Sequence, residues 1–163
     1  ACEPNAAHEL IAKIQREKPA TRIVTQNIDG LHQRAGAADV IELHGSLWRV
    51  RCGSCGAAKE NFALPLKPKH CPCGGWWRPD IVWFEDPLDF GVIEEAVRAI
   101  EACDCLVSIG TSGEVYPAAE LPFIAMRAGA VTIEVNPEET PLSPLYGHVL
   151  RGPATEMMAR LAG

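Results

Sequence analysis

Two amides and a carboxylate stand where a short apolar segment runs out into a turn. Gln26, Asn27 and Asp29 follow the apolar pair 23–24, and the dipeptide Asp29-Gly30 is typical of a turn. In an open parallel α/β sheet, ligands bind in the crevice beyond the carboxyl ends of the strands. We therefore expect these three polar side chains to face a ligand. An Asx-type turn, in which the Asn and Asp side chains bond only the nearby backbone, is the alternative.

Four of the seven cysteines are arranged as two close pairs. Two residues separate Cys52 from Cys55, one separates Cys71 from Cys73, and fifteen lie between the pairs. Such spacing suits two short loops that converge on a tetrahedral metal, and four thiolates with no open position describe a structural zinc site. Two disulfides or four unrelated thiols are the alternatives, and a cytoplasmic setting favours zinc. His70 is another candidate ligand, although the four cysteines already complete the coordination shell.

A histidine stands at the end of a second apolar segment. His44 follows the segment 40–43 and precedes Gly45, which leaves the imidazole with little steric cover. Histidine exchanges protons readily near neutral pH, so this position suits a general base. A packing or surface role is the alternative for any single histidine.

Polar loops follow two further apolar segments. Gly110, Thr111 and Ser112 come after the segment 105–109, and Asn136 comes after the next one. Their backbone N–H groups and small polar side chains could hold phosphate or ribose oxygens at the carboxyl edge of the sheet. Neither loop is a G-x-G-x-x-G fingerprint. Three polar loops after three strands indicate a ligand site more strongly than any one of them.

Length and composition are those of a single globular domain. The chain has 163 residues, of which 47% are hydrophobic and 22% charged. Its net charge of −6 argues against direct binding of nucleic acid but is compatible with a cationic, lysine-bearing peptide. With no apolar run of about 18 residues and no basic-then-apolar leader, we expect no membrane partner and a cytoplasmic location. Because the chain opens Ala-Cys-Glu-Pro without Met, we expect a fragment or a processed product.

Helical and strand patterns alternate along most of the chain. Apolar spacing predicts helices near 4–16, 93–100, 118–128 and 153–161, and strands near 21–25, 40–43, 81–84, 105–109 and 131–135. This alternation predicts an α/β fold with a doubly wound, Rossmann-like parallel sheet. The stretch 47–79 lacks helical periodicity and carries the cysteines, so we expect an inserted zinc-ribbon module there. The Rossmann-like domain would then comprise 1–46 and 80–163.

These motifs, taken in order, resemble one known family. They are Thr-Gln-Asn-Ile-Asp-Gly-Leu-His at 25–32, Glu-Leu-His-Gly at 42–45, the four cysteines, Arg-Pro-Asp-Ile-Val-Trp-Phe at 78–84, Gly-Thr-Ser at 110–112 with Val-Tyr-Pro-Ala at 115–118, and Val-Asn-Pro at 135–137. The ordered set resembles the sirtuins of bacterial type, which are NAD-dependent protein-lysine deacylases. It covers nearly the whole chain and is highly specific.

The resemblance implies a role for each motif. His44 would be the general base that helps a hydroxyl of the NAD ribose to attack after nicotinamide leaves. The nicotinamide and ribose pocket would be lined by Gln26, Asn27 and Asp29, and the adenosine side by Gly110, Thr111, Ser112, Asn136 and Ala154. The acyl-lysine tunnel would be walled by Val82 and Phe84, and the substrate backbone would pair with Glu114, Val115 and Tyr116. NAD would be consumed as a co-substrate, and Zn²⁺ would be structural.

The chain also departs from the family pattern. The Gly-Ala-Gly loop with which sirtuins begin is absent, so we expect the 163-residue chain alone to bind NAD poorly. The tyrosine and arginine that mark desuccinylase-type members belong to the same absent part. Glu85 stands where the family usually has glycine, a residue that permits close backbone approach.

Two other functions are compatible with parts of the sequence. A non-catalytic zinc module that binds a protein or nucleic acid would need only the four cysteines. A hydride-transferring dehydrogenase would use a similar sheet, but the dinucleotide fingerprint is absent. The deacylase hypothesis accounts for all the polar loops together.

Overall fold

The chain folds into a layered α/β part and a separate small sheet. The computed structural model describes residues 2–83 and 86–163. In chain order the elements are α1 (Ala6–Glu17), β1 (Ile23–Thr25), α2 (Leu31–Arg34), β2 (Val40–Glu42), β3 (Gly45–Cys52), β4 (Ala58–Glu60), β5 (Trp77–Ile81), α3 (Phe90–Glu101), β6 (Cys105–Ile109), a 3-10 turn (Ala118–Glu120), α4 (Leu121–Ala128), β7 (Val131–Asn136), a second 3-10 turn (Ser143–Leu145), β8 (His148–Arg151) and α5 (Ala154–Ala162).

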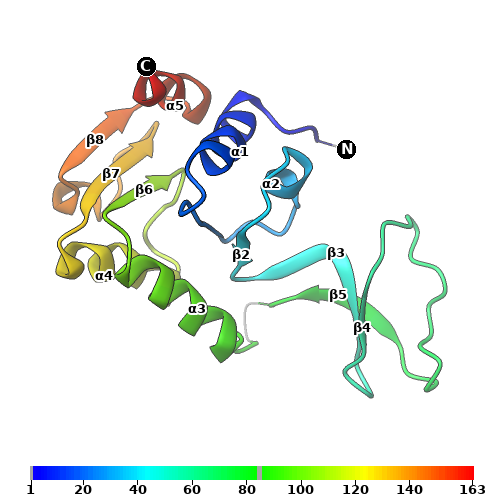
Figure 1. Cartoon of the computed structure of the whole chain (residues 1–163). Helices are drawn as coiled ribbons and strands as arrows, with labels where there is room; N and C mark the ends of the chain where they lie inside the picture. The colour runs from blue at the N-terminus through cyan, green and yellow to red at the C-terminus, as the bar shows by residue number, and fades with distance from the viewer. Residues whose placement is uncertain (1, 84–85) are drawn as a thin grey trace.

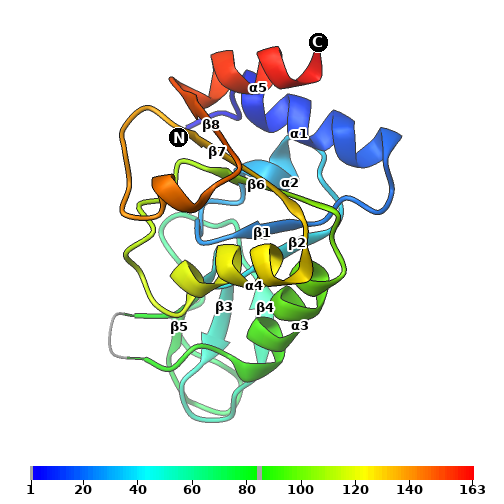
Figure 2. The same cartoon turned by 90° about the vertical axis from the view of Figure 1, so that its left-hand side faces the viewer.

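All pairings in the α/β part are parallel. β1 pairs with β2, and β6, β7 and β8 form a second sheet in that order. Figures 1 and 2 show α1 and α5 together on one face of these strands and α3 with α4 on the other. The predicted α/β class with helices on both faces is confirmed. Within the described residues, β6 forms a ladder with β7 alone, so it lies at an edge of its sheet.

Among the described residues, two larger hydrophobic clusters hold the layers together, and a smaller one of Ala12, Ile23 and Ala37 joins α1 to β1. One joins β2 to α3 and α4 and consists of Ile41, Leu43, Ala96, Ile100, Ala118, Leu121 and Ala125. The other joins β7 to α1 and α5 and consists of Ala7, Val135, Met157 and Met158. Burial of these apolar faces, rather than helix propensity alone, fixes the helices against the strands.

Several element boundaries differ from those predicted. Helix α1 begins after Asn5, whose side chain accepts hydrogen bonds from two backbone N–H groups, so Pro4 precedes the cap instead of lying in the first turn. The helix predicted for 118–128 is divided into a 3-10 turn and α4, which ends at Gly129 in the left-handed conformation. Strand β8 was missed by the sequence pattern.

The cysteine-rich stretch forms an antiparallel sheet in the order β4-β3-β5. It projects away from the parallel strands in Figure 1. The strand predicted at 81–84 is instead β5, which ends at Ile81; Val82 and Trp83 follow it, and residues 84–85 lie outside the described part. Strand β5 therefore belongs to the small sheet, because it pairs along β3.

A buried carboxylate ties the end of β7 to the chain that follows. Glu134 is 2% exposed and accepts hydrogen bonds from Thr140 Oγ1 (2.6 Å), Ser143 Oγ (2.6 Å) and Arg151 Nη1 (2.7 Å). Burial raises the pKa of Glu134, but these hydrogen bonds and the Arg151 charge outweigh it, so the pKa lies below its usual value. The charged form is therefore the one that stabilises the fold.

We predict that Glu134→Gln lowers the free energy of unfolding at pH 7 by about 2–4 kcal/mol, because Arg151 loses its buried partner. Since the folded pKa is depressed, the stabilisation is present above the ordinary carboxyl pKa of about 4.3 and is lost as the pH falls through the folded value. Urea unfolding from pH 7 to pH 3 should show the difference shrinking below about pH 4. The exposed control Glu138→Gln should change little, and a difference independent of pH would contradict this role.

Candidate functional site

The loops that follow three parallel strands are joined by side-chain hydrogen bonds. Gln26, just after β1, donates from Nε2 to Oγ1 of Thr111 at 3.0 Å. Asn136, at the end of β7, donates from Nδ2 to the main-chain oxygen of the same threonine at 2.8 Å. Thr111 follows β6, so it joins the ends of β1 and β7. The structure brings these predicted residues together at the carboxyl edge, where α/β proteins bind ligands.

His44 is attached to the same group by its ring. Its Nδ1 lies 2.9 Å from the main-chain oxygen of Gln26, and the side chain is half-buried. Because a carbonyl oxygen only accepts, Nδ1 carries the proton in this contact and the neutral ring keeps Nε2 as an acceptor. This arrangement leaves one ring nitrogen able to take a proton from a bound ligand.

The turn after Asn27 has both a local and a long-range role. Asp29 Oδ1 accepts from the N–H of Leu31 at 3.0 Å, so the Asx-type turn considered from the sequence is present. The main-chain oxygen of Asp29 accepts from Trp48 Nε1 at 2.6 Å. Gly30 has φ +70°, and a Cβ there would lie 2.7 Å from the Trp48 ring, which excludes a larger residue. Asn27 is exposed at the open side of this turn.

The remaining residues of the expected adenosine side surround the same edge. Gly110 donates to the main-chain oxygen of Val135 at 2.9 Å, and space is open where its side chain would be. Ser112 is exposed, with its hydroxyl accepting from the N–H of Glu114 at 3.3 Å. Ala154 begins α5 and packs against the cluster around Val135.

The residues expected to contact an acyl-lysine peptide lie on two segments. Val82 is half-buried and its N–H donates to the main-chain oxygen of His44 at 3.0 Å, so it adjoins the candidate base. Glu114, Val115 and Tyr116 form an exposed stretch, with Val115 46% and Tyr116 67% exposed. Phe84, expected beside Val82, lies outside the described residues.

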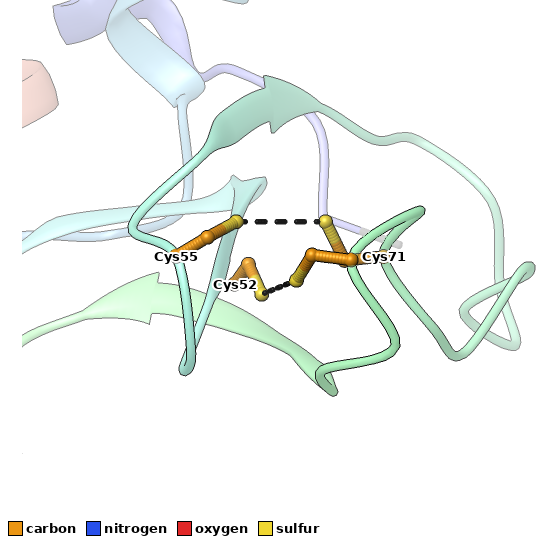
Figure 3. Close-up of side chains that lie close together, drawn as sticks. Cys52, Cys55 and Cys71 are labelled. Atoms are coloured by element: carbon orange, nitrogen blue, oxygen red, sulfur yellow. Dashed lines mark hydrogen bonds between the residues drawn. The ribbon is translucent and has the colours of Figure 1, made fainter.

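The four predicted metal ligands converge. Their sulfur atoms all lie within 4.8 Å of one another, with Cys52 and Cys73 at 3.5 Å and Cys55 and Cys71 at 3.8 Å (Figure 3). A tetrahedral Zn²⁺ with bonds of about 2.3 Å places its sulfurs about 3.8 Å apart, so the cluster fits this ion. The distances exceed a disulfide bond, and the thiols are free.

Local backbone groups favour the thiolate form of one cysteine in this cluster. Hydrogen bonds from the N–H groups of Cys55 and Ser54 lower the pKa of the Cys52 thiol. His70 is not part of the ligand group, because its ring packs against Trp76 with centroids 4.1 Å apart. The structure thus supports four sulfur ligands and a closed, structural site.

A cleft of about 390 Å³ lies between α2, β3 and β4. It is lined by Gly30, Gln33, Arg34, Glu42, Ser46, Trp48, Arg49, Glu60 and Phe62. His44 is not among these residues, and neither are the polar residues that follow β6 and β7. The cleft is therefore separate from the hydrogen-bonded group around Thr111.

Sequence reasoning missed two residues that shape the site. Trp48 supports the turn at Asp29, and Thr25 Oγ1 accepts from the N–H of Asn27 at 3.1 Å. No signal in the sequence pointed to Trp48, because Gly30 indicates a turn but not which distant residue packs against it.

Within residues 2–83 and 86–163, no helix combines the length and the apolar character needed to cross a membrane. The parallel strands, the polar loops at their carboxyl ends and the four converging cysteines define a nucleotide-binding type of α/β protein with an inserted metal-binding module.

Comparison with known proteins identifies the family. A family model described as "Sir2 family" matches residues 1–117. An "NAD-dependent protein deacylase" of Aquifex aeolicus is 47% identical over 146 residues, which cover 88% of this chain and 61% of the relative. An "NAD-dependent protein deacylase 1" of Archaeoglobus fulgidus is 44% identical over 162 residues, covering 98% of this chain and 66% of the relative. The chain belongs to the Sir2 family, the sirtuins, as its motifs indicated.

Solved structures of the family share the fold. A "Sir2 homolog-NAD complex" superposes with a TM-score of 0.90 at 44% identity, covering 98% of this chain and 63% of that one. A structure described as "Sir2-p53 peptide-NAD+" superposes with a TM-score of 0.88 at 34% identity, covering 98% of this chain and 69% of the other. The chain spans about three fifths to two thirds of the length of the curated relatives it matches.

We predict that the chain binds a single Zn²⁺ and that Cys55→Ser abolishes this binding, because a closed tetrathiolate site loses one of its four ligands. Elemental analysis of the purified protein measures the metal content, and amide hydrogen exchange should show lost protection in β3, β4 and β5. Cys105→Ser removes an exposed thiol outside the cluster and should retain full zinc. Equal zinc content in the two variants would contradict the assignment.

Proposed function

We propose that the gene product containing this chain is an NAD-dependent protein-lysine deacylase. The observation that carries the proposal is the hydrogen-bonded group of His44, Gln26, Thr111 and Asn136, which joins a candidate base to polar loops at the carboxyl edge of a sirtuin fold. Relatives of this chain named as NAD-dependent protein deacylases support it.

The proposed reaction transfers an acyl group from lysine to ADP-ribose. With NAD bound, the acyl oxygen would attack the anomeric carbon as nicotinamide leaves, a ribose hydroxyl would then attack the acyl carbon, and water would complete the release of free lysine and O-acyl-ADP-ribose. In this chain Nε2 of His44 would take a proton from a ribose hydroxyl, while Nδ1 stays bonded to Gln26. The side chains of Asn27 and Asp29 would provide polar groups near the cationic sugar that develops.

The cofactor and the peptide would occupy different sides of His44. We assign the adenosine side to Gly110, Thr111, Ser112, Asn136 and Ala154. The acyl-lysine side is assigned to Val82 and Phe84, with the peptide backbone pairing along Glu114, Val115 and Tyr116. The relative whose structure is described with a p53 peptide and NAD+ supports a peptide substrate.

We further propose that the chain divides into a Rossmann-like NAD-binding domain, residues 1–46 and 80–163, and a zinc module, residues 47–79. The separate sheet β4-β3-β5, which begins at Gly45 and ends at Ile81, supports this division. Zn²⁺ at Cys52, Cys55, Cys71 and Cys73 would be structural, since those four thiols leave no position for a substrate.

We predict that the gene product, mixed with NAD and an acetyl-lysine peptide, releases nicotinamide and that His44→Ala reduces the rate at least about a hundredfold, the usual contribution of a general base. Chromatography of the products measures the release of nicotinamide by the wild type and the reduced rate of the variant. The control His148→Ala removes an exposed imidazole at the start of β8 and should leave the rate unchanged. Undiminished turnover in His44→Ala would exclude this residue as the base, and reduction of the nicotinamide ring would indicate a dehydrogenase instead.

A further inference from the structure

The small sheet bends sharply where it leaves the parallel strands. On β3 and β5, Ser46 pairs with Asp80 and Val50 pairs with Pro79, so residues 47–49 have no partners on β5, although Arg49 pairs with Glu60 of β4 on the other side. Such an interruption of an antiparallel ladder bends the strand and redirects its side chains. It lies at the junction of the small sheet with the end of β2.

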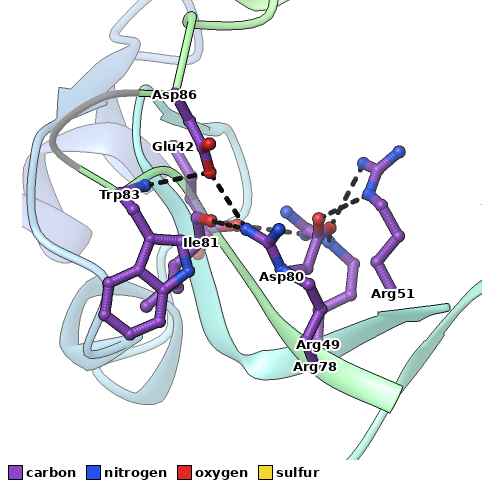
Figure 4. A network of polar contacts seen from close by, with 8 residues as sticks. All are labelled: Glu42, Arg49, Arg51, Arg78, Asp80, Ile81, Trp83 and Asp86. Carbon is purple, nitrogen blue, oxygen red and sulfur yellow. Dashed lines mark hydrogen bonds and ion pairs between the residues drawn. The ribbon is translucent and has the colours of Figure 1, made fainter. Parts of the chain in front are cut away.

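Arg49 extends from this bend and contacts carboxylates from two different sheets. Its Nε lies 2.5 Å from Asp80 Oδ2 on β5, and its Nη1 lies 3.3 Å from Glu42 Oε2 at the end of β2 (Figure 4). The Glu42 and Asp80 side chains are only 13% and 12% exposed. A planar guanidinium can hold two carboxylates at once in a fixed geometry, which a single ammonium cannot do.

Asp80 has a second arginine partner that does not reach the parallel strands. Arg51 Nε lies 2.7 Å from Asp80 Oδ1, and Arg51 is on the same strand as Arg49. Burial raises the pKa of Asp80, but the hydrogen bonds from both arginines outweigh it and hold the pKa below its usual value. Of these two arginines, Arg49 is the one that bridges to Glu42.

The two carboxylates are each two residues from a proposed site residue. Glu42 precedes His44, and Asp80 precedes Val82. The N–H of Val82 donates to the main-chain oxygen of His44 at 3.0 Å, so the two strand ends meet there. The backbones are also close, because a Cβ on Gly45 would lie 2.1 Å from the main-chain oxygen of Asp80. A shift between β2 and β5 would therefore move the candidate base relative to the candidate acyl-lysine wall.

We propose that Arg49 is a positioning residue, which clamps Glu42 to Asp80 and thereby holds His44 and Val82 in register for the transfer step. The inference rests on the proposed deacylase function. Arg49 does not touch the reacting groups. Its effect is on geometry, and a displacement of about 1 Å between reacting groups costs up to about a hundredfold in rate.

The test compares Arg49→Met with Arg51→Met in the complete gene product. Both variants take one cation from Asp80, but only the first breaks the bridge to Glu42. We expect Arg49→Met to lower kcat by about ten- to a hundredfold while the KM for NAD changes less than about twofold, because the residues assigned to the adenosine side follow β6, end β7 or begin α5, away from Arg49. Arg51→Met should keep kcat within about twofold of the wild type, and both should retain zinc.

A spectroscopic readout separates this inference from the proposed function. In ¹³C-histidine-labelled protein, the ring signal of His44 is identified by its loss in His44→Ala. That signal should shift or broaden in Arg49→Met and stay in place in Arg51→Met, whether or not the protein is a deacylase. If the wild type releases no nicotinamide, the proposed function fails while this measurement still tests the clamp.

Two further variants protect the test against misfolding. Glu42→Gln leaves the small sheet untouched and should lower kcat in the same direction, and combining it with Arg49→Met should cost no more than Arg49→Met alone. Arg49→Lys keeps the charge but cannot span both carboxylates, so its kcat should fall between those of the wild type and Arg49→Met. The clamp is overturned if Arg49→Met and Arg51→Met are equally impaired, if the His44 signal is unchanged in Arg49→Met, or if Glu42→Gln is fully active.

Discussion

The candidate site depends on hydrogen bonds that converge on one threonine. The sheets β1-β2 and β6-β7-β8 are not joined by a ladder within the described residues, so their carboxyl ends could separate without breaking any strand pairing. Thr111 connects them, because its hydroxyl accepts from Gln26 and its carbonyl accepts from Asn136. Helices α3 and α4 pack across both sheets and set their spacing, but packing does not specify which polar atoms meet. The hydrogen bonds supply that specificity.

The small sheet is held by different forces from the rest of the chain. Its buried hydrophobic cluster contains Val50, Cys52, Cys71 and Trp77, and two of these four residues are candidate metal ligands. A core of this size cannot order a stretch of loops and short strands without a further constraint, which a tetrathiolate metal provides. The orientation of the small sheet relative to the parallel strands has a different origin. It rests on the Gly45 contact and on charged groups such as Arg49, which the metal does not touch.

The sequence predicted where the candidate residues lie better than it predicted the contacts between them. Spacing alone identified the cysteines, and the polar residues after 23–24, 105–109 and 131–135 were correctly placed at strand ends, because these signals are local. The contact of Trp48 with Asp29 and the bridge of Arg49 to Glu42 were not predictable, since an isolated Trp or Arg in a loop-rich stretch gives no indication of its distant partner. Strand β8 was missed for a similar reason: a short edge strand without alternation becomes recognisable only when β7 is beside it.

The contacts of Gln26 show how a ring orientation and a loop contact can be controlled separately. Its main-chain oxygen accepts from His44, and this acceptor persists whichever side chain occupies the position. Its side-chain amide donates to Thr111, and that contact is lost with any substitution lacking a donor at the same reach. The tautomer of the candidate base is therefore set by the backbone at the end of β1. The contact between the end of β1 and the loop after β6 is set by the Gln26 side chain. The backbone at the end of a strand can thus fix the tautomer of the base while the side chains of the adjoining loop change.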